Sequence, residues 1–205
     1  MQYDILSKER FEILPLLANF KKDFYLAGGT ALALQLGHRD SVDFDFFSPK
    51  DIDTAKLFEK IREVFSEHNL VRTQEEKNTL TLIIDGNIKL SFFSYFYKLV
   101  EPLIEDEYFH LASMVDIGCM KLMAVVSRAT NKDYVDIYYI LQQVSLKKLL
   151  DALQEKIPEL DRNLVLKSLV YFSDISEEPL MFKKGKELGL ETIKKFFVQE
   201  VKRQH

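Results

Sequence analysis

Several features that are common in proteins are scarce or missing in this sequence. Its 205 residues include no tryptophan and one cysteine, Cys119, which excludes an internal disulfide and any cysteine-rich metal site. No apolar run reaches the roughly 18 residues of a transmembrane helix, and no signal peptide is visible. These absences predict a cytoplasmic protein with no membrane association.

A basic surplus is also absent. The chain has 28 Lys and Arg against 32 Asp and Glu, a formal net charge of −4. Proteins that bind nucleic acid over a wide surface carry an excess of positive charge, so any RNA contact here has to be a local basic patch. The apolar content, 47% with 16 Phe and 9 Tyr, is sufficient for a globular core.

The order of secondary-structure signals divides the chain into two parts. Residues 1–105 are expected to run helix, strand, helix, strand, helix and then a β-meander, with a first helix over 7–20 that Pro15 interrupts. Residues 106–205 are expected to be helical apart from a short edge strand at 108–112. The predicted fold is therefore α+β: a mixed β-sheet with flanking helices, followed by a C-terminal helical bundle.

Residues 28–47, GGTALALQLGHRDSVDFDFF, contain the first candidate site. Gly28 and Gly29 follow an apolar strand and precede a short helix. Such a pair allows close backbone approach to a phosphate, and a simple tight turn is the alternative. The stretch is neither a P-loop nor a dinucleotide-binding fingerprint, because the lysine and the third glycine of those motifs are missing.

Two acids alternate with apolar residues in the strand that follows. Asp43 and Asp45 share one strand face, whereas Val42, Phe44 and Phe46 are expected to face the core. Neighbouring carboxylates repel each other unless a cation lies between them, and Mg²⁺ prefers such oxygens together with phosphate oxygens. A solvated strand face is the alternative. The Gly-Gly turn fourteen residues earlier favours the metal site.

A second set of charged residues lies in the helical half. Lys121 and Arg128 are seven residues apart and share one face of a largely apolar helix. Lys121 either extends its ammonium to solvent or points it at an anionic ligand. Asp133 and Asp136 begin the next helix, where acids favour the helix dipole, and Lys132 can form an i,i+4 pair with Asp136.

The histidines show no metal-ligand spacing and no catalytic triad is visible. His38 is expected to lie in a surface loop. Because His38 and Arg39 come shortly before the acid pair, contact with a substrate is the alternative for them.

Taken together, GGTALALQLGHR-x-S-x-DFDFF and the later KLMAVVSRATNKDYVDIYYIL resemble the AbiEii/AbiGii toxin family of bacterial nucleotidyltransferases. That family belongs to the DNA polymerase β-like nucleotidyltransferase superfamily, and the resemblance covers roughly residues 5–180. It implies a nucleotidyltransferase core at 1–105 and a helical domain at 106–205 that completes the cleft. It also implies an NTP substrate, Mg²⁺ or Mn²⁺, and a toxin of a type IV toxin–antitoxin or abortive-infection system with a cognate antitoxin.

The resemblance also assigns roles to individual residues. Asp43 and Asp45 correspond to the metal-binding acids, and Lys121 to a lysine that contacts the triphosphate. The remaining nucleotide-binding positions are Gly28, Gly29, Thr30, Arg128, Lys132 and Asp136. Asp133 is the candidate general base, with Asp136 orienting Lys132 or Arg128. The implied reaction transfers an NMP to an acceptor hydroxyl, with a tRNA 3′ end as one acceptor and a small molecule or a protein as others.

One position departs from the superfamily pattern. A third carboxylate is expected on a later strand, and in Ile88–Phe93 this position is Ser91. A hydroxyl does not replace the charge of a carboxylate on a metal. Either Asp133 or Asp136 supplies the base, or one metal suffices, or the chain is a weak or inactive relative that binds a nucleotide or an antitoxin.

Overall fold

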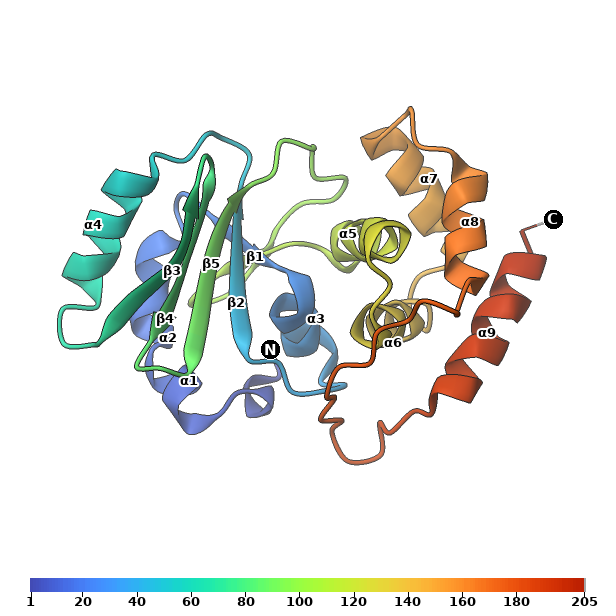
Figure 1. Ribbon diagram of the computed structural model, residues 1–205, viewed down its shortest axis with the longest axis horizontal. Coiled ribbons are helices and arrows are strands. Elements are labelled where there is room, and N and C mark those ends of the chain that lie inside the picture. Colours follow the sequence, from blue (N-terminus) through green and yellow to red (C-terminus); the bar gives the residue numbers. More distant parts are fainter. Residues whose placement is uncertain (205) are drawn as a thin grey trace.

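The computed structural model describes residues 1–204, in which a seven-stranded sheet adjoins a group of helices (Figure 1). The strands are β1 (Tyr25–Ala27), β2 (Asp43–Ser48), β3 (Leu70–Glu76), β4 (Thr79–Ile84), β5 (Ile88–Ser94), β6 (Ile104–Glu105) and β7 (His110–Leu111). The 3-10 helices are η1 (Tyr3–Ile5) and η2 (Ala18–Phe20). The α-helices are α1 (Lys8–Glu12), α2 (Leu14–Leu17), α3 (Gly28–Leu36), α4 (Thr54–Val64), α5 (Met114–Ser127), α6 (Asn131–Ile140), α7 (Leu146–Lys156), α8 (Arg162–Val170) and α9 (Leu190–Lys202). The α+β fold class is confirmed.

The sheet is mixed, with the strand order β3-β4-β5-β2-β1-β7-β6. Strand β2 lies near its centre, parallel to β5 and antiparallel to β1. The parallel register places Asp45 of β2 directly beside Ser91 of β5, and the antiparallel register places Ala27 on its other side. The acid pair is therefore held by backbone pairing on both sides of its strand.

The two faces of the sheet have different surroundings. Phe44 and Phe46 of β2 are fully buried on one face, where the Phe46 ring stacks on the ring of Phe92 with centroids 5.3 Å apart. Helix α4 covers this side (Figure 1). Because side chains alternate along a strand, Asp43 and Asp45 point to the opposite face, towards α3 and the helical half.

Helix α5 is the centre of the helical half, packed against α6, α7 and α8. Gly118 permits this packing, because a Cβ at that position would lie 2.8 Å from Cδ2 of Leu149 on α7. Helix α3, from the first half of the chain, packs on both α5 and α6. None of the helices in the described chain is both long and apolar enough to cross a membrane.

The segment between α8 and α9 returns to the first half of the chain (Figure 1). Ser176 forms a β-bridge with Thr130 ahead of α6, and Phe182 forms another with Arg39, between α3 and β2. The amide of Asp40 donates a hydrogen bond of 2.8 Å to the carbonyl of Met181. This segment therefore ties α6 to the connection that leads into the acid-bearing strand.

Most sequence-based expectations for single elements are confirmed, and two are corrected. The helix expected over 7–20 is divided near Pro15 as expected, and Pro15 lies in the first turn of α2. The expected edge strand at 108–112 is the short β7, which is internal because β6, not expected from the sequence, pairs on its outer side. Val42 was predicted to be in the core and is 50% exposed, because β2 begins one residue later. The domain division at residue 105 stays a prediction.

A buried ion pair connects the helical half to the chain that leaves the sheet. Lys156 at the end of α7 lies 2.6 Å from Asp116 of α5, and both side chains are fully buried. Asp116 also accepts hydrogen bonds from the amides of Val100 and Glu101, at 2.9 and 3.1 Å. Lys156 donates to the carbonyl of Lys98 at 2.5 Å. The pair thus fixes residues 98–101 against α5 and α7.

Replacing Lys156 by Met is expected to lower the free energy of unfolding by about 3 kcal/mol or more, because the buried Asp116 carboxylate loses its counter-ion. Urea unfolding at neutral pH measures this change. Lys147→Met, on the same helix, is the control, since Lys147 forms an exposed pair with Asp151 and its loss should change stability very little. Equal effects of the two substitutions would contradict the assignment.

Candidate active site

The Gly-Gly turn lies directly against the acid pair. Strand β1 ends at Ala27 and α3 begins at Gly28, whose φ is +70°. A Cβ on Gly28 would lie 3.1 Å from Oδ2 of Asp45. Both the left-handed backbone and the close carboxylate therefore require glycine here. The first turn of α3, with its unpaired amides, begins beside the carboxylate of Asp45.

The two acids differ in their environment. The Asp43 side chain is 44% exposed and lies 3.9 Å from the ammonium of Lys89, whereas Asp45 is buried deeply enough for its pKa to be affected. Burial, followed by repulsion from Asp43, raises the pKa of Asp45. The ammonium groups of Lys89 and Lys121 and the Ser91 hydroxyl act in the opposite direction. An enclosed carboxylate beside a second one is a position where a cation would be stabilised.

Ser91 occupies the position where a third carboxylate is expected from the sequence. It is buried and pairs with Asp45 on one side and with Thr81 of β4 on the other. Across the described chain, no group of three or more His, Cys, Asp or Glu side chains is arranged to hold a metal ion. Asp43 and Asp45 can supply two carboxylates to a divalent ion, which leaves the other coordination positions for water and phosphate oxygens, the arrangement that Mg²⁺ prefers.

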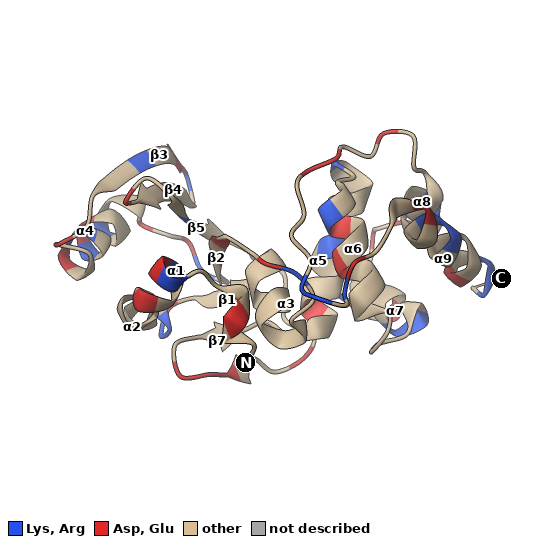
Figure 2. Ribbon diagram, turned by 90° about the horizontal axis from the view of Figure 1, so that it is seen from below, with Lys and Arg blue, Asp and Glu red and all other residues tan. Residues whose placement is uncertain are grey.

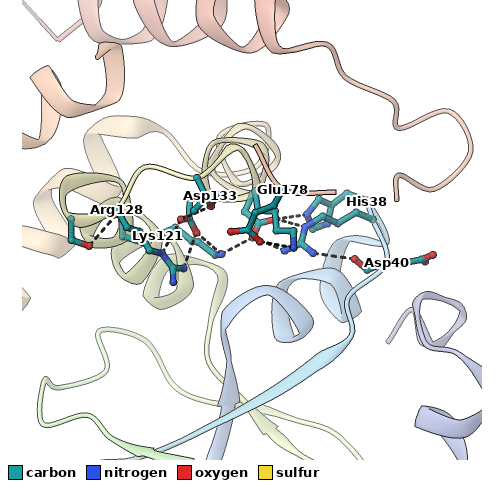
Figure 3. Close-up of polar contacts among 12 residues, drawn as sticks. His38, Asp40, Lys121, Arg128, Asp133 and Glu178 are labelled. Atoms are coloured by element: carbon teal, nitrogen blue, oxygen red, sulfur yellow. Dashed lines mark hydrogen bonds and ion pairs between the residues drawn. The ribbon is translucent and has the colours of Figure 1, made fainter. Parts of the chain in front are cut away.

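A buried network in the helical half is centred on Asp136 of α6, and Figure 3 shows His38, Lys121, Asp133 and Arg128 of this network lying together. The carboxylate of Asp136 lies 2.8 Å from Nζ of Lys121 and 2.9 Å from Nε2 of His38. Arg39 binds it through two parallel hydrogen bonds of 2.8 Å, from Nε to Oδ1 and from Nη2 to Oδ2. Asp136 is fully buried, so these three donors replace the water that its charge would otherwise require.

Asp133 continues the network on the other side of Lys121. Its Oδ1 lies 2.9 Å from Nζ of Lys121, and its Oδ2 accepts a hydrogen bond of 2.9 Å from the Thr130 hydroxyl. Arg128 donates to Asp133 through Nε at 3.3 Å, with most of its side chain exposed. Lys121 is therefore clamped between Asp133 and Asp136. Charged positions of both signs lie close together on α5 and α6 in Figure 2.

Burial and charge pairing oppose each other in this network. Burial alone would raise the pKa of Asp136, but Lys121 and Arg39 outweigh it and hold the pKa well below its usual range. The pKa of Asp133 is lowered in the same way, with Lys121 outweighing burial. Burial lowers the pKa of His38, so its ring is neutral at pH 7. The network consists of two carboxylates and the cations that pair with them.

Arg39 and Lys121 connect the network to the acid pair. A Cβ on Gly29 would lie 2.5 Å from Nη2 of Arg39, so the guanidinium lies between the Gly-Gly turn and Asp136. The charge of Lys121 also acts on Asp45, since it lowers the pKa of that carboxyl. The two candidate sites of the sequence therefore lie next to each other.

The structure corrects several expected contacts. Lys132 pairs with Glu178 at 2.8 Å, not with Asp136, because the 171–189 segment brings that acid to the start of α6. Asp136 consequently orients Lys121 and Arg39, and contacts neither Lys132 nor Arg128. The Thr30 hydroxyl is buried and donates to the backbone carbonyl of Asp43. That bond ties α3 to β2.

His38 is also corrected: it was expected in a surface loop and is fully buried against Asp136. Arg39 was considered only as a substrate contact, and its bidentate bond to Asp136 spans 97 residues of sequence. One feature of the sequence could have indicated this contact. Arg39 comes shortly before Asp43 and Asp45, and Asp136, if buried, requires a basic partner.

Similarity to known proteins decides the family. The family described as "Nucleotidyl transferase AbiEii toxin, Type IV TA system" matches residues 16–200. The chain belongs to this family. It is also 36% identical to the protein aq_aa25 of Aquifex aeolicus (strain VF5) in an alignment that covers 96% of each chain. The resemblance stated from the sequence motifs is confirmed.

Solved structures support the same fold for this AbiEii-family protein. MenT4, a nucleotidyltransferase toxin of Mycobacterium tuberculosis H37Rv, superposes with a TM-score of 0.64 at 13% identity, covering 93% of this chain and 80% of that chain. JHP933 of Helicobacter pylori gives 0.57 at 18% identity, with 97% and 96% covered. The Megavirus polyadenylate synthase gives 0.51 at 13% identity, with 69% and 32% covered.

Asp136→Asn is expected to lower the free energy of unfolding by about 3–5 kcal/mol at pH 7, because buried Lys121 and Arg39 lose their shared counter-ion. The depressed pKa of Asp136 means that its contribution is present above the ordinary carboxyl pKa of about 3.9. It is lost as the pH falls through the lower value of the folded state. Urea unfolding should show a constant wild-type advantage from pH 7 to about 5 and a shrinking one below about pH 4.

Asp174→Asn is the control for this series, since Asp174 is an exposed acid in the segment after α8. Its stability should follow that of the wild type at every pH. A wild-type advantage over Asp136→Asn that grew with acidification would contradict the assignment, because it would require a raised pKa.

Proposed function

We propose that the protein transfers a nucleoside monophosphate from an NTP to an acceptor hydroxyl, at the place where the acid pair of β2 adjoins the α5–α6 network. The observation that carries this proposal is the position of Asp45, which lies against the Gly28 turn and within the electrostatic reach of Lys121. Phosphate-binding amides, paired carboxylates and a clamped lysine then meet at one place, and these are the parts that nucleotidyl transfer needs.

The phosphates of the NTP are assigned to the turn and to the cations around it. Gly28 and Gly29 present backbone amides at the N-terminus of α3, where the helix dipole favours an anion. Lys121 contacts two carboxylates, which leaves one of its three N–H groups for a phosphate oxygen. Arg128 is largely exposed and can extend to the terminal phosphate while it stays close to Asp133. Thr30 and Lys132 stay proposed as supporting residues.

Asp43 and Asp45 are proposed to hold Mg²⁺ or Mn²⁺. Their proximity and the raised pKa of Asp45 fit a bound cation, since burial and then the neighbouring Asp43 destabilise the charge of Asp45. When bound, a divalent ion would neutralise charge on the phosphates and on the oxygens of the transfer. The side chains around the acid pair would orient the NTP and the acceptor.

The chemical step is an in-line displacement at the α-phosphorus. The acceptor oxygen forms a new P–O bond, the bond between the α-phosphorus and the bridging oxygen breaks, and pyrophosphate leaves with that electron pair. The proton of the acceptor hydroxyl passes to a carboxylate of the site, for which Asp133 stays the proposed base. Its three donors and its lowered pKa also give it a second role, which is to hold Lys121 in place.

The proposed acceptor is an RNA 3′ end, such as that of a tRNA, and the proposed setting is the cytoplasm, where NTP and tRNA occur together. The polyadenylate synthase of the same fold supports a polynucleotide acceptor. Family membership further supports a cognate antitoxin as partner. The second candidate function is a weakly active or inactive protein that binds a nucleotide or the antitoxin. Ser91 favours it, because the superfamily expects an acid at this position beside Asp45.

Asp43→Asn and Asp45→Asn are each expected to reduce transfer of label from an α-labelled NTP to total tRNA by at least about a hundredfold, because one carboxylate cannot hold the divalent ion. Asp174→Asn, with its exposed carboxylate, should transfer label at the wild-type rate. Equal transfer by wild type and Asp43→Asn would exclude the assigned site. A nucleotide-dependent rise in Tm of the wild type without transfer to any acceptor would favour the second function.

Ser91→Asp places a carboxylate beside Asp45 and tests the departure from the superfamily pattern. We expect the variant to reach half-maximal transfer at a lower Mg²⁺ concentration, because three carboxylates bind a divalent ion more tightly than two. Ser91→Asn, of similar size and without charge, is the matched control. An unchanged Mg²⁺ dependence in a variant that keeps the wild-type Tm would show that this position does not contact the metal.

A further inference from the structure

A large pocket lies at the far end of β2, beyond the acid pair. Its volume is about 690 Å³, within the range of small-ligand sites. Its walls are the connection ahead of β1, the N-terminal half of α4 with the loop before it, and residues 96–99 after β5. Ser48, the last residue of β2, lines it and lies three residues beyond Asp45, about 10 Å along the strand.

Positive charge gathers around this pocket although the whole chain is negative. The lining includes six lysines and three aspartates. Lys22, Lys50 and Lys98 are exposed, and none of them has an ion-pair partner within residues 1–204. The other three pair with acids: Lys21 with Glu105, Lys56 with Asp53, and Lys60 with Asp23. This is the local basic patch that an RNA contact requires in a chain of net charge −4.

Two aromatic rings complete the lining. Phe96 is 62% exposed and Tyr97 is 42% exposed, and the two rings are consecutive in the loop after β5. The Tyr97 ring packs on Tyr95 with centroids 5.2 Å apart, and the carbonyl of Lys98 is bound by the buried Lys156. The exposed rings are therefore presented by an ordered backbone.

We propose that this pocket binds a single-stranded segment of the polynucleotide acceptor, with lysines on its phosphates and Phe96 and Tyr97 stacked on its bases. Sites that bind single-stranded nucleic acid combine positive side chains with exposed aromatic rings. An acidic protein segment would contact only the lysines, and the rings of Phe96 and Tyr97 would have no function in binding it. The inference rests on the proposed function, since the pocket begins at Ser48, the last residue of the strand that carries the acid pair.

Binding of a short fluorescent single-stranded RNA to the full chain, measured by fluorescence polarisation without NTP or metal, tests the proposal. The triple substitution of Gln for Lys22, Lys50 and Lys98 should weaken binding about tenfold and reduce the dependence on salt, because phosphate contacts are lost. The control replaces three exposed lysines on α8 and α9, away from the pocket: Lys167, Lys195 and Lys202. Equal losses in the two triple variants would overturn the proposal.

Phe96→Ala separates base stacking from charge. We expect it to weaken RNA binding about tenfold with the salt dependence unchanged. Polyglutamate should compete poorly with the RNA on the wild type. Unchanged affinity of Phe96→Ala, or competition by polyglutamate as strong as that by RNA, would assign the pocket to acidic ligands in general and overturn the proposal.

Asp45→Asn distinguishes the pocket from the transfer reaction. It should bind the RNA with wild-type affinity and transfer no label. If the wild type transferred no label while the pocket variants still lost RNA binding, the proposed function would fail and the binding site would stand. If label were transferred to RNA and the pocket variants bound it normally, the site would fail and the function would stand.

Discussion

The charge of Asp136 is the constraint on which the rest of this structure depends. A carboxylate without solvent contact is stable only if it is fully paired, and Asp136 obtains its donors from both halves of the chain. His38 and Arg39 come from the connection between α3 and β2, and Lys121 comes from α5. The two halves must therefore dock before the network is satisfied. As a result, Lys121 faces the acid pair only in the complete fold.

Local backbone geometry places the Gly28 turn against the acid pair. The antiparallel pairing of β1 with β2 places the Gly28 turn against Asp45, and only glycine fits both its positive φ and the close approach of the carboxylate. Thr30, buried beneath the turn, binds the backbone of β2 and fixes the start of α3. The sheet thus positions the acids, and α3 fixes them relative to α5 and α6, because it packs on both helices. The Gly-Gly turn, which by itself indicates little, becomes specific through its neighbours.

The elements were largely predictable because their signals are local. Caps such as Ser113 and Thr130, the alternation in β2 and the Asp85–Asn87 turn each depend on a few consecutive residues. Partners at long range were not predictable in this way. Arg39 meets Asp136 and Lys132 meets Glu178 only because α3 and the 171–189 segment pack against α6. Neither pairing leaves a periodic pattern, so the candidate residues were found and their contacts were not.

The ion pairs of Lys121 with Asp133 and Asp136 explain why such a site keeps buried charges. An ammonium free in an apolar cleft would tend to lose its proton, whereas two carboxylates hold the pKa of Lys121 above its ordinary value. Lys121 therefore stays a cation whether or not a nucleotide is present. Its position is fixed by the same two contacts, so little reorganisation is needed when phosphate arrives. In the proposed reaction Asp136 acts on the nucleotide through Lys121, whereas Asp133 both holds Lys121 and is the proposed base, and this proposal accounts for two acids on a helix that would face an anionic ligand.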